Sequence, residues 1–274
     1  LINNWFMMYF LSVILIGTVY PIFLEVIASK KISVGPPFYN KLILPFLIPF
    51  LFAMTIGPKL KWIKSEIKNK FIMISFLIIS FFLSLVIIKS LSINFLINSV
   101  LVTSALFLFF NTMRDFFKTK FKNLSQSIAH FGFSLFILSI LFNNIFSFEV
   151  ITNLKVGETF QSNELKINFE SLDQKKDKNF KAFIGKFNIE NKDGLFEILY
   201  PELRIYNQPN IVTSEADIKT NLLSDRFITM NTVQNEEYFN IRYQHKPFMI
   251  WIWLSVIIIC FGGLLSLFRK KYEN

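Results

Sequence analysis

The sequence predicts an α-helical polytopic membrane protein of about six transmembrane helices, with a small β-rich external domain before the last helix. Two observations carry this prediction: apolar residues gather in long blocks, and one long segment near the C-terminus breaks that pattern. Of the 274 residues, 53% are hydrophobic, and the mean hydropathy is +0.45. Soluble domains have a lower apolar content, roughly 45–50%.

Six blocks are long and apolar enough to cross a bilayer, which takes roughly 20 residues of helix. Lipid offers no hydrogen-bond partner to a free backbone group, so each block must be helical. Turn residues mark both ends of the second block: Gly35 permits a positive φ, Pro36-Pro37 stiffens the entry to the helix, and Gly57-Pro58 ends it. The expected spans are 5–24, 38–57, 71–88, 93–112, 126–146 and 247–267.

Basic residues predict the orientation, because short cytoplasmic loops of membrane proteins collect Lys and Arg. Loops 57–70 and 113–125 and the tail after residue 268 hold most of the basic residues that lie outside 147–246. We expect this side to be cytoplasmic, or matrix in a mitochondrion, so the net charge of +10 requires no nucleic-acid partner. The expected location is the bacterial inner (cytoplasmic) membrane, as a multi-pass protein, with the mitochondrial inner membrane as the alternative.

Three domains follow from these spans. Residues 1–146 are expected to form a five-helix membrane region, and residues 147–246 a periplasmic or intermembrane-space β-rich domain. Residues 247–274 are expected to form the final transmembrane helix and a short cytoplasmic tail.

Segment 147–246 differs from the rest because its apolar residues are spread out and it holds most of the acidic residues. Residues 180–206 indicate two strands around Asp193-Gly194, a favoured hairpin turn. Further strands are expected at 225–230 and 238–243, and a solvated loop at 171–179.

Several classes of site are excluded or disfavoured by the sequence. Cys260 is the single cysteine, so neither a disulfide framework nor a zinc pattern can form within the chain. No nucleotide-binding, hydrolase or metalloprotease motif is present. Glu25 and Asp115 lie at span ends and are expected to be solvated. The scarcity of charge within the spans argues against a small-solute transporter.

His130 is one of only two histidines, and it lies near the start of the fifth apolar block. A buried imidazole must be satisfied, either by a hydrogen bond to a neighbouring helix or by a metal. Gly132 leaves room for a close neighbour, and the residues alone leave both interpretations open. His245, where segment 147–246 meets the last span, is expected to be an ordinary solvated interfacial residue.

Six stretches share their order, spacing and membrane placement with one family. They are LIGTVYP (15–21), SVGPPFYN (33–40), IGPKLKW (56–62), IAHFGFSLFILSI (128–140), YNQPNIVTSEADI (206–218) and KPFMIWIWLSVIIICFGGLLSLF (246–268). Taken together, they make the chain resemble the C-terminal half of CcmF, the haem-lyase subunit of the cytochrome c maturation system.

The resemblance implies a function. CcmF proteins take haem from a haem-carrier chaperone and, with apocytochrome c and its thioreduction and chaperone subunits, attach the haem to CxxCH thiols. They also hold an intramembrane haem b, and one axial ligand of its iron is the histidine of an AHxG sequence. Here that sequence is Ala129-His130-Phe131-Gly132, so the resemblance implies that His130 is the iron ligand. An imidazole is a common axial ligand of haem.

Departures from the family limit what this chain is expected to do alone. The family's tryptophan-rich haem-handling segment is absent, because Trp5, Trp62, Trp251 and Trp253 are isolated or at span ends. The second membrane histidine is absent too, and no catalytic residue is assigned. The resemblance therefore implies one part of a haem lyase (holocytochrome c synthase) complex. The rest would come from the N-terminal half of the same protein or from a separately encoded partner.

The alternative is a non-catalytic membrane scaffold that recruits assembly partners through its external domain. In that interpretation His130 makes a structural hydrogen bond. Trp251 and Trp253 are expected at the lipid headgroups in either case.

Overall fold

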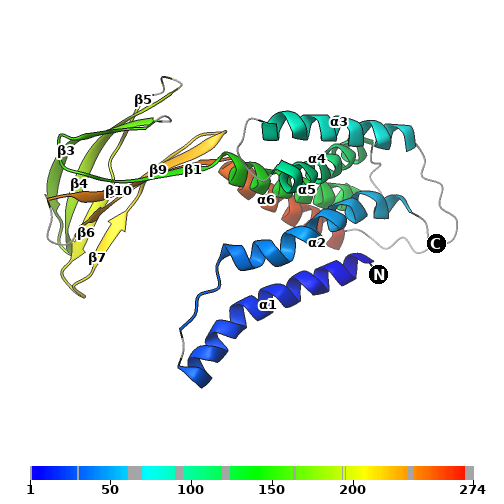
Figure 1. Ribbon diagram of the computed structural model, residues 1–274, viewed down its shortest axis with the longest axis horizontal. Coiled ribbons are helices and arrows are strands. Elements are labelled where there is room, and N and C mark those ends of the chain that lie inside the picture. The colour runs from blue at the N-terminus through cyan, green and yellow to red at the C-terminus, as the bar shows by residue number, and fades with distance from the viewer. Residues whose placement is uncertain are drawn as a thin grey trace. The chain divides into compact units, whose positions relative to one another are not determined.

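The computed structural model describes residues 2–29, 31–60, 70–89, 95–118, 124–162, 165–192, 194, 196–233 and 237–268. Within these residues the chain forms six long helices and ten strands (Figure 1). It divides into two compact units. One comprises Leu1–Leu138 with Ser255–Asn274, and the other comprises Ser139–Leu254.

The six described long helices are all long and apolar enough to cross a membrane. Together with the β-sandwich that follows the fifth helix, they confirm the predicted fold class. Pro36 and Pro37 occupy the first turn of the second helix, where the missing N–H costs nothing. The helices are α1 (Ile2–Ala28), α2 (Pro36–Ile56), α3 (Lys70–Lys89), α4 (Phe95–Lys118), α5 (Leu124–Phe146) and α6 (Met249–Leu267), with a short 3₁₀ helix η1 (Gly57–Lys59) after α2.

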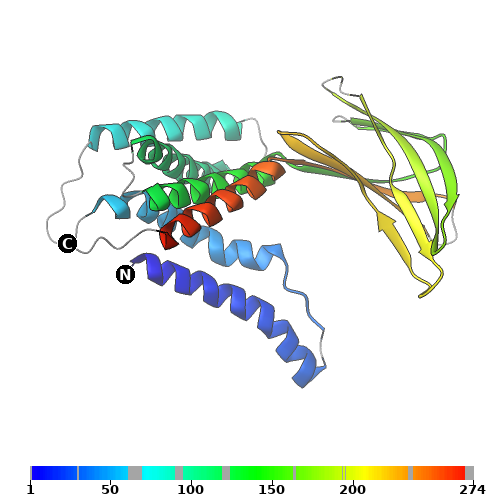
Figure 2. The same cartoon turned by 180° about the vertical axis from the view of Figure 1, so that it is seen from behind.

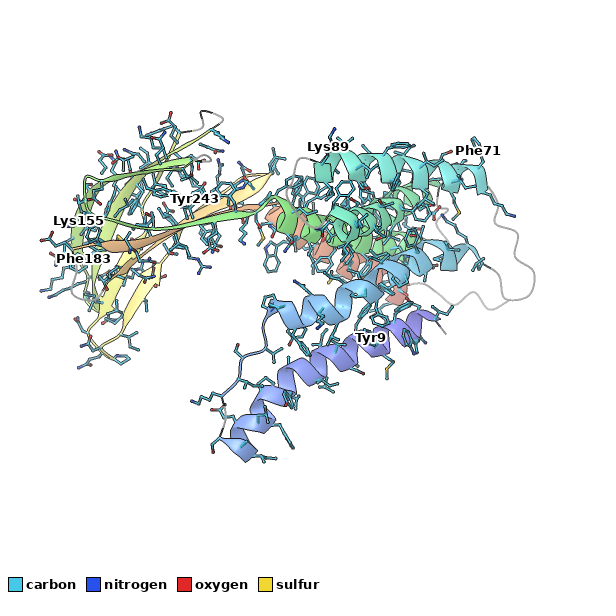
Figure 3. All side chains as sticks on the ribbon, viewed as in Figure 1. Tyr9, Phe71, Lys89, Lys155, Phe183 and Tyr243 are labelled. Atoms are coloured by element: carbon cyan, nitrogen blue, oxygen red, sulfur yellow. The ribbon has the colours of Figure 1, made fainter. Side chains whose placement is uncertain are left out.

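Helix α4 is the centre of the helical unit. It is far more buried than the other helices, and it packs against α2 and α3. Polar contacts join these helices: the hydroxyl groups of Ser84 on α3 and Thr103 on α4 lie 2.7 Å apart. Helix α1 packs on α2 through Tyr9, which donates a hydrogen bond to the Leu42 carbonyl at 2.9 Å and lies against Phe46 (Figure 3). Hydroxyl contacts of this kind join helices where lipid removes the hydrophobic drive to associate.

The second unit contains a sandwich of two antiparallel sheets. The first sheet has the order β1-β10-β9-β8, and the second has the order β2-β3-β4-β6-β7, with β5 also paired to β4. The strands are β1 (Phe148–Leu154), β2 (Thr159–Gln161), β3 (Leu165–Lys176), β4 (Phe180–Asn191), β5 (Phe196–Leu199), β6 (Glu202–Tyr206), β7 (Val212–Glu215), β8 (Asp217–Thr220), β9 (Ser224–Thr232) and β10 (Phe239–Pro247).

Both sheets contribute to one apolar core. Phe169 and Phe187 stack with ring centroids 4.3 Å apart, and Ile228, Met230 and Ile241 from the other sheet are fully buried with them. Alternate residues of each strand point inward, as the two-residue period of a strand requires. The sandwich therefore has a hydrophobic core of its own.

The predicted hairpin turn is confirmed, but three strands rather than two occupy 180–206, because the second predicted strand is interrupted at 200–201. Strands β4 and β5 pair antiparallel, with Glu190 opposite Phe196, and Gly194 adopts φ +74° in the connection. Glycine is the residue that takes such a φ without steric cost. Asp193 lies outside the described residues. The strands expected at 225–230 and 238–243 are β9 and β10, which pair with each other.

The prediction of a loop at 171–179 is wrong for residues 171–176. These residues continue β3, which pairs with β4 as far as Lys176 opposite Lys181. Their side chains are mostly solvated, as expected, but the backbone gains a complete ladder along β4. Solvated side chains therefore do not distinguish a loop from a long strand that extends beyond the core.

Most of the charges behind the predicted orientation lie in residues 61–69, 119–123 and 269–274, outside the described residues. The orientation therefore stays a prediction.

Candidate functional site

The candidate site centres on His130, in the second turn of α5. Helices α2, α4 and α6 contact α5 through residues close to His130. These contacts describe the surroundings of the imidazole. All of these contacts lie within the helical unit.

Helix α6 crosses α5 at very short range beside His130, and the two helices run side by side in Figures 1 and 2. A Cβ on Gly262 would lie 2.7 Å from the backbone nitrogen of Ala129. A Cβ on Gly132 would lie 3.0 Å from the backbone nitrogen of Ile259. At Gly262 the obstructing atoms belong to the backbone, so only glycine fits there. At Gly132 an added Cβ would also meet the Ile258 side chain at 2.9 Å, so a larger residue would require that side chain to shift. The two glycines thus fix how closely α6 approaches the helix that carries His130.

Helix α4 contacts another face of α5. Phe131 stacks on Phe116, with centroids 5.4 Å apart, and the Ser134 hydroxyl lies 2.7 Å from that of Thr112. Both of these hydroxyl groups are buried, and their contact fixes the rotation of α5 against α4.

Helix α2 contacts α5 through Phe50, whose ring meets Phe133 edge to face at 6.2 Å. Successive residues of an α-helix point about 100° apart. His130 therefore points between the directions of Phe133, which faces α2, and Ser134, which faces α4. The side chain is half-buried there.

The described residues offer the His130 ring no hydrogen bond. The structural hydrogen bond that the sequence left open as an alternative thus has no partner in the described part of the chain. Among the described residues nothing occupies the unprotonated imidazole nitrogen, so this nitrogen can coordinate a metal.

A small polar cluster joins η1, which follows α2, to α4 in the helical unit. The Lys59 ammonium donates a 2.5 Å hydrogen bond to the side-chain oxygen of Asn111, which is buried, and lies 3.7 Å from an Asp115 oxygen. Asp115 was expected to be merely solvated. It is instead half-exposed and paired, because η1 turns Lys59 back toward α4. Glu25 is solvated as expected, in an exposed pair with Lys31.

This cluster could have been suspected from the sequence. Asn111 is a carboxamide within an apolar block, and such a side chain needs a partner in a membrane. The identity of that partner, Lys59, depends on how α2 packs on α4, and no local pattern reveals it.

No three His, Cys, Asp or Glu side chains of the described residues come together as a metal site. A site built from several protein ligands is therefore not found in this part of the chain. A haem needs only one or two axial ligands from protein, because the porphyrin supplies the other four. A single imidazole such as His130 fits that requirement.

His245 lies on β10 in the other unit and is not the solvated residue that was expected. Its ring lies 5.1 Å from that of Phe148, and its Nδ1 atom is buried with no partner among the described residues. Burial, and then the Arg226 guanidinium opposite it on β9, hold the pKa of His245 below its ordinary value. Its position on a paired strand, rather than in a linker, explains the burial.

Arg226 also belongs to a second polar group that the sequence did not reveal. Its guanidinium lies 2.9 Å from a Glu197 carboxylate oxygen, and both side chains are largely buried. The pair joins β9 of one sheet to β5 of the other. Tyr243 lies near this pair, and burial of its hydroxyl group raises its pKa to about 12. No sequence signal links Glu197 to Arg226, since they lie on different sheets.

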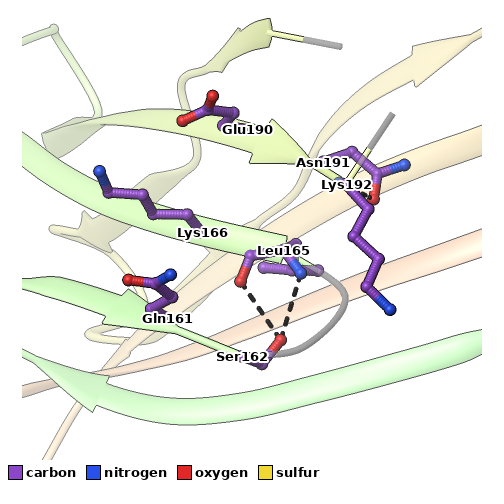
Figure 4. A pocket seen from close by; sticks show the side chains of 7 residues that line it. All are labelled: Gln161, Ser162, Leu165, Lys166, Glu190, Asn191 and Lys192. Atoms are coloured by element: carbon purple, nitrogen blue, oxygen red, sulfur yellow. Dashed lines mark hydrogen bonds between the residues drawn. The ribbon is translucent and has the colours of Figure 1, made fainter. Parts of the chain in front are cut away.

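A groove of 490 Å³ opens at one end of the six-stranded sheet (Figure 4). The Ser162 hydroxyl is hydrogen-bonded to the backbone of Leu165 there. Its lining mixes both signs of charge and has no histidine or cysteine. The lining residues are Gln161, Ser162, Leu165, Lys166, Glu190, Asn191 and Lys192.

Comparison with known proteins shows which proteins this chain resembles. Residues 145–247 match the family model described as the CcmF C-terminal beta-sandwich. All of the chain aligns with the cytochrome c-type biogenesis protein CcmF of Haemophilus influenzae at 29% identity, covering 45% of that protein. The CcmF of Escherichia coli matches at 26% identity over 100% of the chain and 44% of its own length. The resemblance to the C-terminal half of CcmF is confirmed.

A solved structure agrees at the level of fold. The cytochrome c haem lyase CcmF superposes with a TM-score of 0.73 at 18% identity, covering 98% of this chain and 45% of that one. The chain therefore spans about half the length of the CcmF proteins it matches.

Proposed function

We propose that the chain forms the C-terminal part of a cytochrome c haem lyase, acts in cytochrome c maturation, and supplies one axial ligand to an intramembrane haem b through His130. The relatives named cytochrome c-type biogenesis proteins support the process. One observation carries the ligand assignment: a half-buried imidazole on a membrane helix has no hydrogen-bond partner among the described residues.

The residues around His130 fit a haem. Phe131 and Phe133 pack the helix that carries the histidine against α4 and α2, and α6 approaches the same helix closely at Gly132. A haem b there would supply a one-electron redox couple within the membrane. This chain's own contribution would be to orient the imidazole and to keep water away from it.

The proposed division of labour follows the three predicted domains. Residues 1–146 and 247–274 would hold the haem, and residues 147–246 would contact partners on the outer side of the bacterial inner membrane. The proposed partners are a haem-carrier chaperone, apocytochrome c with its thioreduction and chaperone subunits, and the missing N-terminal half or a separately encoded equivalent. Thioether formation would require that missing half.

The test is to express the chain together with that N-terminal half and to compare two variants that each remove one histidine. We expect His130→Ala to lose the low-spin b-type absorbance of the purified complex. His245→Ala, which removes the only other histidine of the chain, should keep it. A low-spin signal unchanged in His130→Ala would overturn the ligand assignment.

The scaffold alternative makes a different prediction for the same preparation. A scaffold would co-purify with its partners but contain no haem in the unaltered complex. Measuring haem and partner content together therefore separates the two functions.

A further inference from the structure

The turn between β8 and β9 carries two exposed leucines. Leu222 and Leu223 have 68% and 67% of their surface accessible, among the highest values in the sandwich unit. Adjacent large apolar side chains at a tight turn are unfavourable in water, where each would be better buried. Nothing in the described part of this unit covers them.

The turn that presents them is well defined. Asn221 is hydrogen-bonded through its backbone N–H to the Ser224 carbonyl at 3.0 Å. Its side-chain oxygen accepts hydrogen bonds from the backbone N–H groups of Leu223 and Ser224, at 2.9 and 2.7 Å. This Asx-type arrangement fixes the backbone of the turn, so the two leucines project from a rigid support.

The same turn is tied to the first turn of a membrane-spanning helix. The Phe248 N–H donates to the Leu223 carbonyl and the Trp251 indole N–H donates to the Leu222 carbonyl, each at 2.8 Å. Trp251 lies in the first turn of α6, and β10 leads into that helix with only Phe248 between. All of these residues belong to one unit.

This connection places the leucines at the level where α6 meets the lipid. Indole rings at the ends of spans settle among the headgroups, and a ring that is bonded to the turn holds the turn at that depth. Leu222 and Leu223 extend from the same turn and have no protein cover among the described residues.

We propose that Leu222 and Leu223 insert into the headgroup–acyl boundary of the bilayer, as a second membrane attachment of the sandwich beside α6. The partner is the lipid surface itself. The attachment would limit the rotation of the sandwich about the α6 axis. It depends on neither haem nor the proposed lyase function.

The chain offers a clean experiment because Cys260 is its only cysteine. In a Cys260→Ser background, Leu222→Cys and Leu223→Cys are each labelled with a polarity-sensitive fluorophore. Ile211→Cys provides a matched control, because Ile211 is also an exposed apolar residue, at 50%, in the β6–β7 connection. The full chain is reconstituted into vesicles of phosphatidylethanolamine and phosphatidylglycerol, with a nitroxide near the head of the acyl chain.

The proposal predicts blue-shifted emission and strong lipid-nitroxide quenching for labels at 222 and 223, and neither for the label at 211. A water-soluble quencher should affect the label at 211 most. Equal behaviour of all three labels would overturn the proposal. Labels at 222 and 223 that are shielded from both quenchers would overturn it in favour of a protein contact.

Discussion

The two units are stabilised in different ways. The sandwich closes an apolar core from both of its sheets, with Phe169, Phe187 and Met230 fully buried. In the helical unit only α4 is mostly buried, while few residues of α1, α2, α3 and α6 are buried. Its helices meet through glycine, hydroxyl and carboxamide contacts rather than through a large core.

The difference shows where each unit can be perturbed. The sandwich depends on hydrophobic burial, so the loss of volume should damage it most. The helical unit lies in a solvent as apolar as its own side chains, so burial adds little, and close approach of backbones matters more. Four substitutions test this contrast.

The largest effect is expected in the sandwich core. Phe187→Ala removes a fully buried ring and should lower the free energy of unfolding by about 3–5 kcal/mol. Chemical denaturation of the full chain in detergent, followed by the β signal in circular dichroism, measures it. Phe196→Ala, which removes a ring that is 61% exposed on the next strand, is the control. Equal losses in the two variants would contradict a core centred on Phe187.

The ion pair between the sheets should come next. Glu197→Gln leaves the buried Arg226 guanidinium without its counter-charge and should cost roughly 3 kcal/mol. Combining it with Arg226→Met should restore most of the loss. Glu170→Gln, which breaks an exposed pair with Lys186, should change little. The same denaturation measurement applies, and a double variant no more stable than the single one would refute the pairing.

The third substitution tests the packing of helices in the helical unit. Gly262→Ala drives a methyl group into the backbone of Ala129 and should cost roughly 1–3 kcal/mol. Gly263→Ala is the control, because nothing lies within 4 Å of its added Cβ. Thermal unfolding in detergent, read from the helical signal, compares them. If both variants melt alike, the close crossing of α5 and α6 is not what holds these helices.

The smallest effect concerns pH. The pKa of His245 is lowered in the folded sandwich, chiefly by burial and also by Arg226, with a hydrogen bond to the Phe146 backbone and then Glu197 opposing. The unfolded chain then binds a proton more readily, so this contribution is fully present above about pH 6.5 and declines as the pH falls. His245→Phe should flatten the pH dependence of the melting temperature on the acid side. An unchanged pH profile would show that His245 is not the group responsible.

Local sequence patterns predicted the elements that form through interactions between residues close together in the sequence. Apolar blocks gave all six helices, because a span must be apolar along its whole length. The Gly194 turn and the strands now labelled β9 and β10 followed from turn chemistry and alternation. His130 was singled out because an imidazole near the start of an apolar run is rare.

Contacts between distant residues could not be predicted in the same way. The Lys59–Asp115 and Arg226–Glu197 pairs join different helices or different sheets. Many other pairings of charged residues would have been equally consistent with the sequence. The extension of β3 was missed because its outer half has mostly polar side chains, and it is held by the ladder with β4 and by the single apolar contact of Leu172. Burial of His245 depends on a neighbour from β1, the far end of the domain in sequence.

The pairing of β1 with β10 has a consequence for biosynthesis. Strand β1 is made first in the sandwich, yet its ladder partner is the last strand, with Phe148 opposite His245. During synthesis β1 leaves its edge unpaired until almost the entire sandwich has been made, and α6 follows immediately after β10. Unpaired edges of this kind attract other strands. A chaperone that shields β1 would therefore have its greatest effect in the interval before α6 enters the membrane.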